Sequence, residues 1–475
     1  MNLAGRCRLA VLILMLCTCN GCGTASPEDS ATDGTAVAPR QITLKVAVID
    51  DAVLGPVIQR QFGARRNGEI QLTELSWQEF ADGDFAVASD NDILIYPMWR
   101  LGELASRDLL TPITDDNMPR EDSDRRSILR SDRENTIGWG GQEVAVSLGQ
   151  SHWVMLCRTD VLEEHKLDIP ATWKEFSDLA AQLARQTGSD LPQRIAVPLK
   201  DHWASAVLFV RAASGIRLPG RYSSFFDVGS MQPLIDTEPF LRSLQGWDTD
   251  VIDSAVPQDP EEILLDYASG KIAIAVVPLN ARWLDNVDSE SLPPTTIVPV
   301  PFWSGVYDQP QERWIERRKD DSPIVPLVGS SGMLASTSAN SSQLRNSMDF
   351  LTWVTEKQIS TIVSVESRHA GLSRKSHLGN PAKWLGSSFS AEQARQFANV
   401  LTEANESRLR LNSLRIPDAS RYLAALDEAI RRVMIEDANS VEELAGVAQT
   451  WSLIASESNP EETKANYRRS EGLRR

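Results

Sequence analysis

The sequence contains little cysteine, little histidine and too few basic residues to balance its acidic ones. Four of the five cysteines lie within the first 22 residues, so the body of the chain has only Cys157 and cannot form an internal disulfide. The net charge of −17 disfavours binding to the phosphates of nucleic acid. The five histidines are not paired at metal-ligand spacing, so neither a metal nor another cofactor is expected.

Several catalytic motifs are absent as well. The chain has no HExxH, no GxSxG and no GxxxxGK[ST], which are typical of zinc proteases, serine hydrolases and P-loop proteins. These absences argue against an enzyme. A glycosidase, however, needs only two carboxylates about 5–10 Å apart, and the sequence leaves open that Asp51 faces Asp201 in this way.

The first residues are typical of an export signal. Arg6 and Arg8 precede the apolar run Leu9–Leu16, which is too short to span a bilayer but suits the core of a signal peptide. No later run approaches the roughly 20 apolar residues of a membrane-spanning helix. We therefore expect export, with residues 1–21 as a lipoprotein signal peptide.

Gly21 and Cys22 resemble the bacterial lipobox, in which the cysteine is lipidated and becomes the mature N-terminus. Cys19 stands where this signal prefers leucine and is itself a second candidate, and an ordinary signal peptide remains the alternative. Residues 22–40 are small and polar, which predicts a flexible tether. The expected location is a membrane surface, on its periplasmic or cell-surface side, with the lipid on Cys22 as the anchor.

The body begins with alternating strands and helices. Strands are expected at Ile42–Ile49, Glu69–Leu75 and Asn91–Tyr96, with helix patterns after the first and third. This alternation predicts a parallel sheet covered by helices, in which ligands bind at the carboxyl ends of the strands. The residues at those ends are Asp50, Asp51, Trp99 and Arg100. For Asp51 a helix cap is an equal alternative.

The stretch 141–176 contains two short β runs, Glu143–Leu148 and Trp153–Arg158, separated by a polar break. A strand that stops and restarts without a hairpin signal can pass from one sheet to another. Thr172 and Glu175 have the spacing of a capping box and predict a helix that begins at Trp173. By itself, the order strand, strand, helix is common to many α/β proteins.

In the second half the pattern changes from strands to helices. Strand regions are expected at Arg194–Leu199, Lys271–Val277, Thr295–Pro301 and Ile324–Ser336, and helices at Ser341–Glu356, Glu392–Glu403, Tyr422–Ile435 and Val441–Ser456. The last residues, 461–475, are polar and predicted to be disordered.

Five short signatures, in this order, resemble the extracellular solute-binding proteins of ABC importers, the family that includes maltodextrin-binding proteins. They are Asp92–Ile113 (DILIYPMWRLGELASRDLLTPI), Gly141–Phe176, Tyr267–Val277 (YASGKIAIAVV), Ser330–Ser336 with Asp349–Trp353, and Arg368–Leu378 (RHAGLSRKSHL). Two positions depart from the family pattern, because Ser147 replaces the usual hinge proline and Ser373 stands where the family tends to have proline.

The resemblance implies an α/β, periplasmic-binding-protein-like fold with two lobes, joined by crossover strands with a ligand cleft between them, and a helical C-terminal part. Lobe 1 would consist of residues 41–149 and 297–355, and lobe 2 of residues 150–296 and 356–460. The chain would cross at 149–152, near Thr295 and near Thr355.

Carried over by position, the family's ligand contacts fall at the strand ends, the first crossover and two loops of lobe 2. These residues are Asp50, Asp51, Trp99, Arg100, Ser151, His152, Asp201, Trp203, Asn280 and Trp283. Such a set suits a sugar, since carboxylates and arginine bond hydroxyl pairs and indoles cover the C–H face of a pyranose. Each tryptophan could equally belong to the core.

The resemblance therefore implies a lipid-anchored, monomeric solute-binding component that captures a sugar or oligosaccharide by hinge closure. Its partners would be the solute, the membrane and the permease subunits of an ABC importer. Polyamines, peptides and organic anions are bound by related scaffolds. Two alternatives remain at this point, an exported glycan-acting enzyme and a binding subunit that serves a sensor without transport.

Overall fold

The computed structural model describes most of the chain after residue 41. The described ranges are 42–66, 68–118, 125–133, 137–185, 194–216, 222–246, 257–285, 287, 292–317, 325–327, 332–385, 388–407, 409–457 and 459–473. Residues 41–475 form one compact unit. The predictions for the signal peptide, Cys22 and the tether lie outside the described residues.

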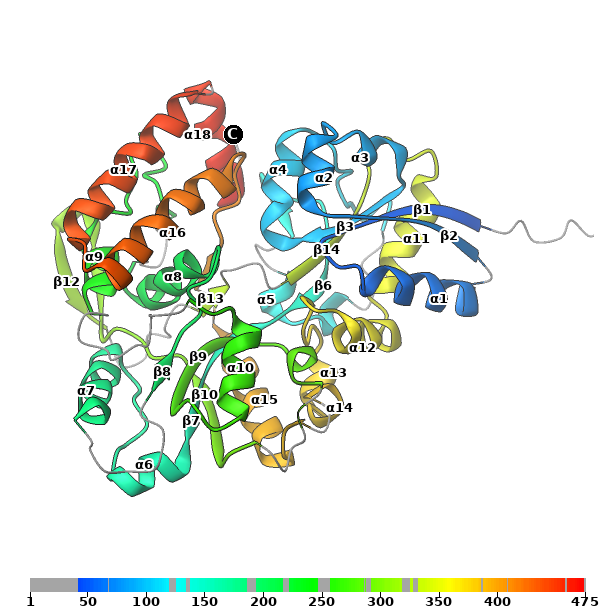
Figure 1. Cartoon of the computed structure of the whole chain (residues 1–475). Helices are drawn as coiled ribbons and strands as arrows, with labels where there is room; N and C mark the ends of the chain where they lie inside the picture. The colour runs from blue at the N-terminus through cyan, green and yellow to red at the C-terminus, as the bar shows by residue number, and fades with distance from the viewer. Residues whose placement is uncertain are drawn as a thin grey trace, which may run out of the picture. The chain divides into compact units, whose positions relative to one another are not determined.

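The first sheet has the strand order β2-β1-β3-β14-β6 (Figure 1). Its strands are β1 (Ile42–Ile49), β2 (Gly68–Leu75), β3 (Ile93–Pro97), β6 (Val146–Gln150) and β14 (Gly332–Thr337). Strand β1 runs parallel to β2 and β3, and β14 runs antiparallel to both β3 and β6. As predicted for a sheet covered on both faces, β3, β6 and β14 are buried along their whole length.

The second sheet has the order β10-β7-β9-β8. Its strands are β7 (His152–Arg158), β8 (Ile195–Ala196), β9 (Ile274–Leu279) and β10 (Thr295–Pro299). Only Ser151 separates β6 of the first sheet from β7 of the second. The prediction that the interrupted double strand passes between two sheets is therefore confirmed.

Small two-stranded pairs complete the β structure. They are β4 (Gly138–Trp139) with β5 (Gln142–Glu143), β11 (Gly305–Asp308) with β12 (Arg313–Glu316), and β13 (Val325–Leu327) with β15 (Arg410–Asn412). The predicted strand Glu143–Leu148 is thus wrong in its first residues, because β5 ends at Glu143 and β6 begins at Val146.

Helices cover both faces of each sheet. Around the first sheet lie α1 (Leu54–Arg66), α2 (Trp77–Asp82), α3 (Ala86–Asp90), α4 (Leu101–Ser106), α11 (Leu344–Val354) and α12 (Lys357–Glu366). Around the second lie α6 (Thr159–His165), α7 (Trp173–Ala184), α8 (Trp203–Ile216), α9 (Glu238–Gln245), α10 (Pro260–Ala268), α14 (Ala382–Leu385), α15 (Ala391–Glu406), α16 (Ala419–Glu436) and α17 (Ser440–Glu457). The short helices α5 (Arg130–Arg133) and α13 (Lys375–Leu378) lie near the crossovers, and α18 (Pro460–Ser470) ends the described chain.

The capping box predicted from the sequence is present at the start of α7. Thr172 Oγ1 accepts from the amide of Glu175 at 3.2 Å, and the Glu175 carboxylate accepts from the amide of Thr172 at 3.0 Å. This capping box is the one expected from the spacing. Trp173 then packs into the core as the first residue of the helix.

Two predicted lobe boundaries, those at residues 297 and 355, differ from the structure. Strand β10 pairs with β7 over its whole length, so residues 297–299 belong to the second sheet. Trp303 packs in the same core and β13 contacts α8 and β7, so the chain returns to the first sheet only after β13. Helix α12 packs into the core of the first sheet through Ile359 and Val363, so the last crossing lies well after Thr355. Ala370 belongs to that core and Leu372 to a core of the second sheet, which places the last crossing at Gly371.

The predicted disorder of residues 461–475 is wrong for the part that the structure describes. Helix α18 begins after Asn459, whose side chain caps it by accepting from the amide of Glu461 at 3.1 Å. Tyr467 is fully buried, and its hydroxyl accepts from the amides of Ser224, Phe225 and Phe226 at 3.2–3.3 Å. The polar composition of residues 461–475 gave no indication that Tyr467 anchors this helix in the core.

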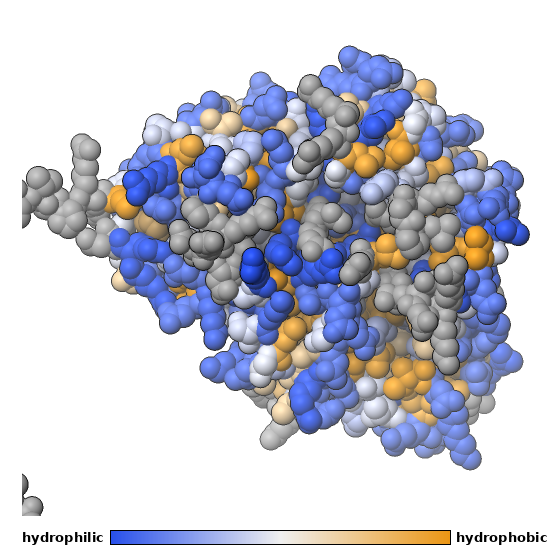
Figure 2. All heavy atoms as spheres, turned by 180° about the vertical axis from the view of Figure 1, so that it is seen from behind, coloured by the Kyte–Doolittle hydropathy of each residue, from blue (hydrophilic) through white to orange (hydrophobic). Residues whose placement is uncertain are grey.

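The surface agrees with the acidic, hydrophilic composition. On the face drawn in Figure 2, hydrophilic residues dominate and hydrophobic ones show only in separate patches. None of the described helices is both long and apolar enough to cross a membrane.

Candidate functional site

Two loops at the carboxyl ends of the first sheet form one side of the candidate site. Asp50 follows β1 with a left-handed φ of +61°, and its carboxylate accepts from the amide of Trp77 at 2.8 Å. Trp99 and Arg100 follow β3 in a turn of 3₁₀ helix, Met98–Arg100. Asp50 and Arg100 lie close enough for the charge of Asp50 to act on the guanidinium of Arg100.

Arg100 is held between two indoles. Its guanidinium carbon lies 3.5 Å from the ring centroid of Trp99 and 4.1 Å from that of Trp77. Burial lowers the pKa of Arg100 to about 9, and the charges of Asp50 and Glu103 oppose the shift. Arg100 therefore remains a cation at neutral pH, stabilised by cation–π contacts.

The loop before α8 provides the other side. The imidazole of His202 stacks on Trp99, with ring centroids 6.5 Å apart and planes 23° from parallel. Burial lowers the pKa of His202 to about 4, so the ring is neutral at pH 7. Trp99, which follows β3 of the first sheet, thus faces His202, which follows β8 of the second. A hinge movement between the sheets would separate these two rings.

Little space remains between the two sides. The cavity there has a volume of about 20 Å³, lined by Trp99, His202, Ser205, Ala206, Phe209, Ser413 and Leu423. That is room for about one water molecule. Trp99 Nε1 and Arg100 Nε are buried and have no hydrogen-bond partner among the described residues. The cavity beside Trp99 is therefore small, and the two donors could bond a polar guest that enters it.

Two predicted contact residues have structural roles instead. Asp51 is buried, and its carboxylate accepts from the amide of Leu54 at 3.1 Å and from the hydroxyl of Ser367 at 2.6 Å. The first of these bonds is the helix-cap role kept as an alternative. The Asn280 side chain donates to the carbonyls of Arg368 and Ala370 at 3.0 and 3.2 Å. Both side chains fix the segment that leads to the last crossing.

The remaining residues of the second sheet are not brought together around one space. Trp283 packs in a hydrophobic core, and Trp203 packs edge-on against Trp153 at 6.1 Å between centroids. Both indoles are therefore core residues here. Asp201 is exposed next to His202, and Ser151 is buried in the crossover.

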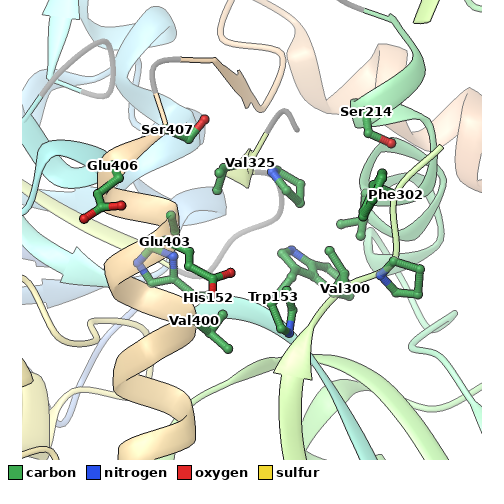
Figure 3. Close-up of a pocket in the computed structure, with 15 residues that line it drawn as sticks. His152, Trp153, Ser214, Val300, Phe302, Val325, Val400, Glu403, Glu406 and Ser407 are labelled. Atoms are coloured by element: carbon green, nitrogen blue, oxygen red, sulfur yellow. The ribbon is translucent and has the colours of Figure 1, made fainter. Parts of the chain in front are cut away.

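His152 lies in a different place from Trp99. Its imidazole lines a separate cavity of about 290 Å³ together with Trp153, Val400 and Glu403 (Figure 3). Among the residues that the structure describes, this cavity and the one beside Trp99 share no lining residue.

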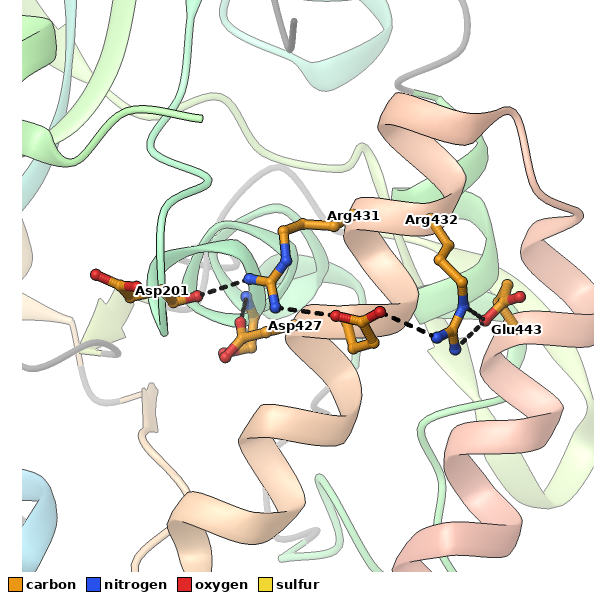
Figure 4. Close-up of polar contacts among 7 residues, drawn as sticks. Asp201, Asp427, Arg431, Arg432 and Glu443 are labelled. Carbon is orange, nitrogen blue, oxygen red and sulfur yellow. Dashed lines mark hydrogen bonds and ion pairs between the residues drawn. The ribbon is translucent and has the colours of Figure 1, made fainter. Parts of the chain in front are cut away.

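Helix α16 forms hydrogen bonds with the segment that contains His202 (Figure 4). Arg431 donates to the carbonyl of Asp201 at 3.3 Å, and the Asp427 carboxylate accepts from the amide of Ser205 at 2.7 Å. Burial raises the pKa of Asp427 to about 7, against the hydrogen bonds from Ser205 and the charge of Arg431. The position of His202 therefore depends on the C-terminal helices.

Sequence reasoning did not select three of the residues that meet here. Trp77 follows β2, so the argument from strand ends could have found it. His202 lies between Asp201 and Trp203, which the sequence analysis did select as ligand contacts. His369 approaches the carbonyl oxygen of Asp50 with Nε2 at 3.1 Å; it lies in the signature Arg368–Leu378 but was not selected as a ligand contact. Among the described residues, no group of three or more His, Cys, Asp or Glu side chains could hold a metal ion.

Comparisons with known proteins identify the family and the fold of this chain. The family model described as bacterial extracellular solute-binding protein matches residues 86–364. The chain belongs to this family. The recognition made from the five signatures is thereby confirmed, and no curated protein matches the chain.

Solved structures show the same fold. A solute-binding protein of an ABC transporter from Agrobacterium radiobacter K84, in complex with ribitol, is 16% identical with a TM-score of 0.63, over 87% of this chain and 98% of that one. The sugar-binding protein MalE from Xanthomonas citri is 14% identical with a TM-score of 0.65, over 87% and 98%. The cyclic alpha-maltosyl-1,6-maltose binding protein from Arthrobacter globiformis is 14% identical with a TM-score of 0.62, over 88% and 100%. The predicted two-lobed, periplasmic-binding-protein-like fold is confirmed.

Proposed function

We propose that this protein is the solute-binding component of an ABC importer and captures a sugar or polyol by closing its two lobes. The observation that carries the proposal is the stacking of Trp99 on His202, across the point where β6 and β7 belong to different sheets. A hinge at the crossovers would separate these rings and admit a ligand between them.

The chemistry of the cluster supports a polyhydroxylated ligand. Trp99 offers an indole face, while Asp50 and the charged Arg100 offer an acceptor and donors for hydroxyl pairs. Ribitol is bound by one structural neighbour, D-mannitol by another and maltose by a third. We therefore restrict the proposed ligand to this class and place Asp50, Trp99, Arg100 and His202 at its centre.

The rest of the assignment follows from the sequence. We propose that Cys22 is lipidated and that the tether up to residue 40 reaches roughly 20–25 Å from the membrane. Lobe 1 would contain the first sheet with α11 and α12, and lobe 2 the second sheet with α15–α17. The chain would cross at Ser151, after β13 and at Gly371. The proposed partners are the permease subunits, which a monomer would meet with both lobes.

We propose that the protein binds without catalysis. The glycosidase alternative placed Asp51 opposite Asp201, but the Asp51 carboxylate is engaged by Leu54 and Ser367. Burial raises the pKa of Asp132 to about 7, yet this carboxyl is fully buried and bonded to Ser131 and Ser147. These bonds support a role for both carboxyl groups in the structure, in agreement with binding without catalysis.

Thermal denaturation of the compact unit, residues 41–475, with ribitol, D-mannitol, maltose and maltotetraose tests the proposal. A true ligand at 100 times its dissociation constant should add about 2.7 kcal/mol of stability. Arg100→Gln should abolish this gain. Arg107→Gln is the matched control, since Arg107 also stacks on an aromatic ring, that of Phe85, at 4.3 Å.

Three results would refute the proposal. One is the absence of a saturable shift with any sugar or polyol. Another is an equal loss of binding in the Arg107→Gln control. The third is turnover of a glycoside, which would favour the enzyme.

A further inference from the structure

A cavity of about 290 Å³, lined by His152, lies near the first crossover (Figure 3). It lies beyond the end of β10 and is bordered by the C-terminal turns of α15, by α8 and by β13. Its volume is close to the lower end of the range for small-molecule sites, about 300 Å³.

Apolar groups form most of the wall. They are Trp153, Val210, Pro299, Val300, Pro301, Phe302, Val325, Pro326, Val400 and Ala404. Such a wall favours a ligand with a hydrocarbon or aromatic body, because burying that body releases it from water.

One buried polar group faces this wall without a partner. His152 is only 3% exposed, and its Nε2 has no hydrogen-bond partner among the described residues. Burial, with a smaller effect of the Arg410 charge, lowers the pKa of His152 to about 4, so the ring is neutral at pH 7. A buried polar atom without a partner is costly, and a ligand in the cavity could satisfy it.

The charge of the lining is negative. Glu403 and Glu406 lie one turn apart on α15, both exposed and both at the cavity. The described lining residues include no lysine and no arginine. Arg410, which influences His152, is not among them, and its guanidinium donates to the carbonyl of Ser407.

We propose that this cavity binds a small organic cation, an amine carried on an apolar or aromatic body. The body would lie between Trp153 and Phe302, and the ammonium group would point toward Glu403 and Glu406. His152 would supply the hydrogen bond inside the cavity. The indole of Trp153 adds a cation–π surface for the same charge.

This site is separate from the proposed sugar site but connected to it. A series of ring contacts runs from Trp99 to His202 at 6.5 Å, to Trp203 at 5.0 Å and to Trp153 at 6.1 Å. His152 also follows Ser151 directly at the crossover. An occupant would therefore touch the hinge without entering the space beside Trp99.

Calorimetric titration of residues 41–475 with three probes of similar size tests the proposal. The probes are phenethylamine, which is cationic at pH 7, neutral 2-phenylethanol and anionic 3-phenylpropionate. We expect saturable binding of phenethylamine, at least tenfold tighter than that of either other probe. The double variant Glu403→Gln/Glu406→Gln should weaken phenethylamine at least fivefold and leave 2-phenylethanol unchanged.

Two further variants make the test specific. Val300→Trp, which fills the cavity, should abolish binding of phenethylamine, whereas Glu392→Gln, on the same helix but outside the cavity, should not affect it. Equal affinity for the three probes, tighter binding of the anion, or no saturable binding of phenethylamine would overturn the proposal. So would unchanged binding in the double glutamine variant. The sugar titrations report separately on the Trp99 site, since the two cavities share no residue.

Discussion

Replacing Gly149 by alanine should destabilise the crossover between β6 and β7. Gly149 has a φ of +108°, which L residues rarely adopt. A Cβ at this position would also collide with the carbonyl oxygen of Gly371. Gly371 in turn faces the carbonyl of Gln150. The two glycines allow the first and the last crossing segments to lie against each other.

The magnitude follows from these two effects. The backbone conformation costs a non-glycine residue about 1–3 kcal/mol, and forcing an extra carbon into a packed site costs about 1–3 kcal/mol. We therefore expect Gly149→Ala to lower the free energy of unfolding by about 2–6 kcal/mol. Gly371→Ala should cost only the packing part, about 1–3 kcal/mol, because Gly371 has no left-handed φ and its Cβ would meet the carbonyl of Gln150.

Urea denaturation of residues 41–475, followed by tryptophan fluorescence, measures the effect. Gly446→Ala is the matched control, because no atom lies within 4 Å of a Cβ at that position on α17. As a helix glycine, Gly446 should gain about 0.5–1 kcal/mol when replaced by alanine. If Gly149→Ala unfolded within about 1 kcal/mol of the wild type, a typical single-mutant effect, the close contact of the two crossings would be refuted.

Three further predictions concern the C-terminal helices. Tyr467→Phe removes the acceptor of three buried amides and should lower the free energy of unfolding by about 1–3 kcal/mol in urea; no change would mean that α18 is not anchored there. The carboxyl of Asp427 has a raised pKa in the folded state, so its stabilising effect is complete below pH 3.8 and is lost as the pH rises through about 7. Relative to Asp427→Asn, the wild type should therefore lose stability over this range, and parallel pH profiles would contradict the assignment. Glu103→Ala removes the acceptor of the Asp418 amide, 3.1 Å away, and should increase the radius of gyration of the unliganded protein in small-angle scattering, whereas Arg107→Gln should not; equal radii would contradict this.

The crossing between sheets could be predicted because its signal is local. Two β runs of Val and Leu, interrupted by polar residues without a hairpin turn, leave few other arrangements, and β6 and β7 confirm it. The capping box of Thr172 and Glu175 is local in the same sense. The third crossing was misplaced because α12 continues the packing of α11, and only the tertiary core shows that Ile359 belongs to the first sheet.

The candidate site was predicted less well for a chemical reason. An aspartate or asparagine after a strand can bond a ligand or a neighbouring loop with the same atoms. Asp51 and Asn280 bond the segment around Ser367 and Ala370, and nothing in their own sequence surroundings distinguishes the two uses. Trp283 shows the same ambiguity for an indole, which fits a core as well as a sugar.

The C-terminal helices help to determine how the two sides of the site meet. Helix α16 fixes the His202 loop through Asp427 and Arg431, and the amide before it, that of Asp418, bonds Glu103 on α4. In helix α18, the hydroxyl of Tyr467 accepts from the amide of Phe225, which packs in the core of the second sheet. The carbonyl of Arg469, on the same helix, accepts from the amide of Gly140, near the first sheet, at 3.0 Å. A hinge movement that separates Trp99 from His202 must therefore break these bonds or carry the helices along. The crossover strands permit the movement, but the free energy of closure also depends on these C-terminal contacts.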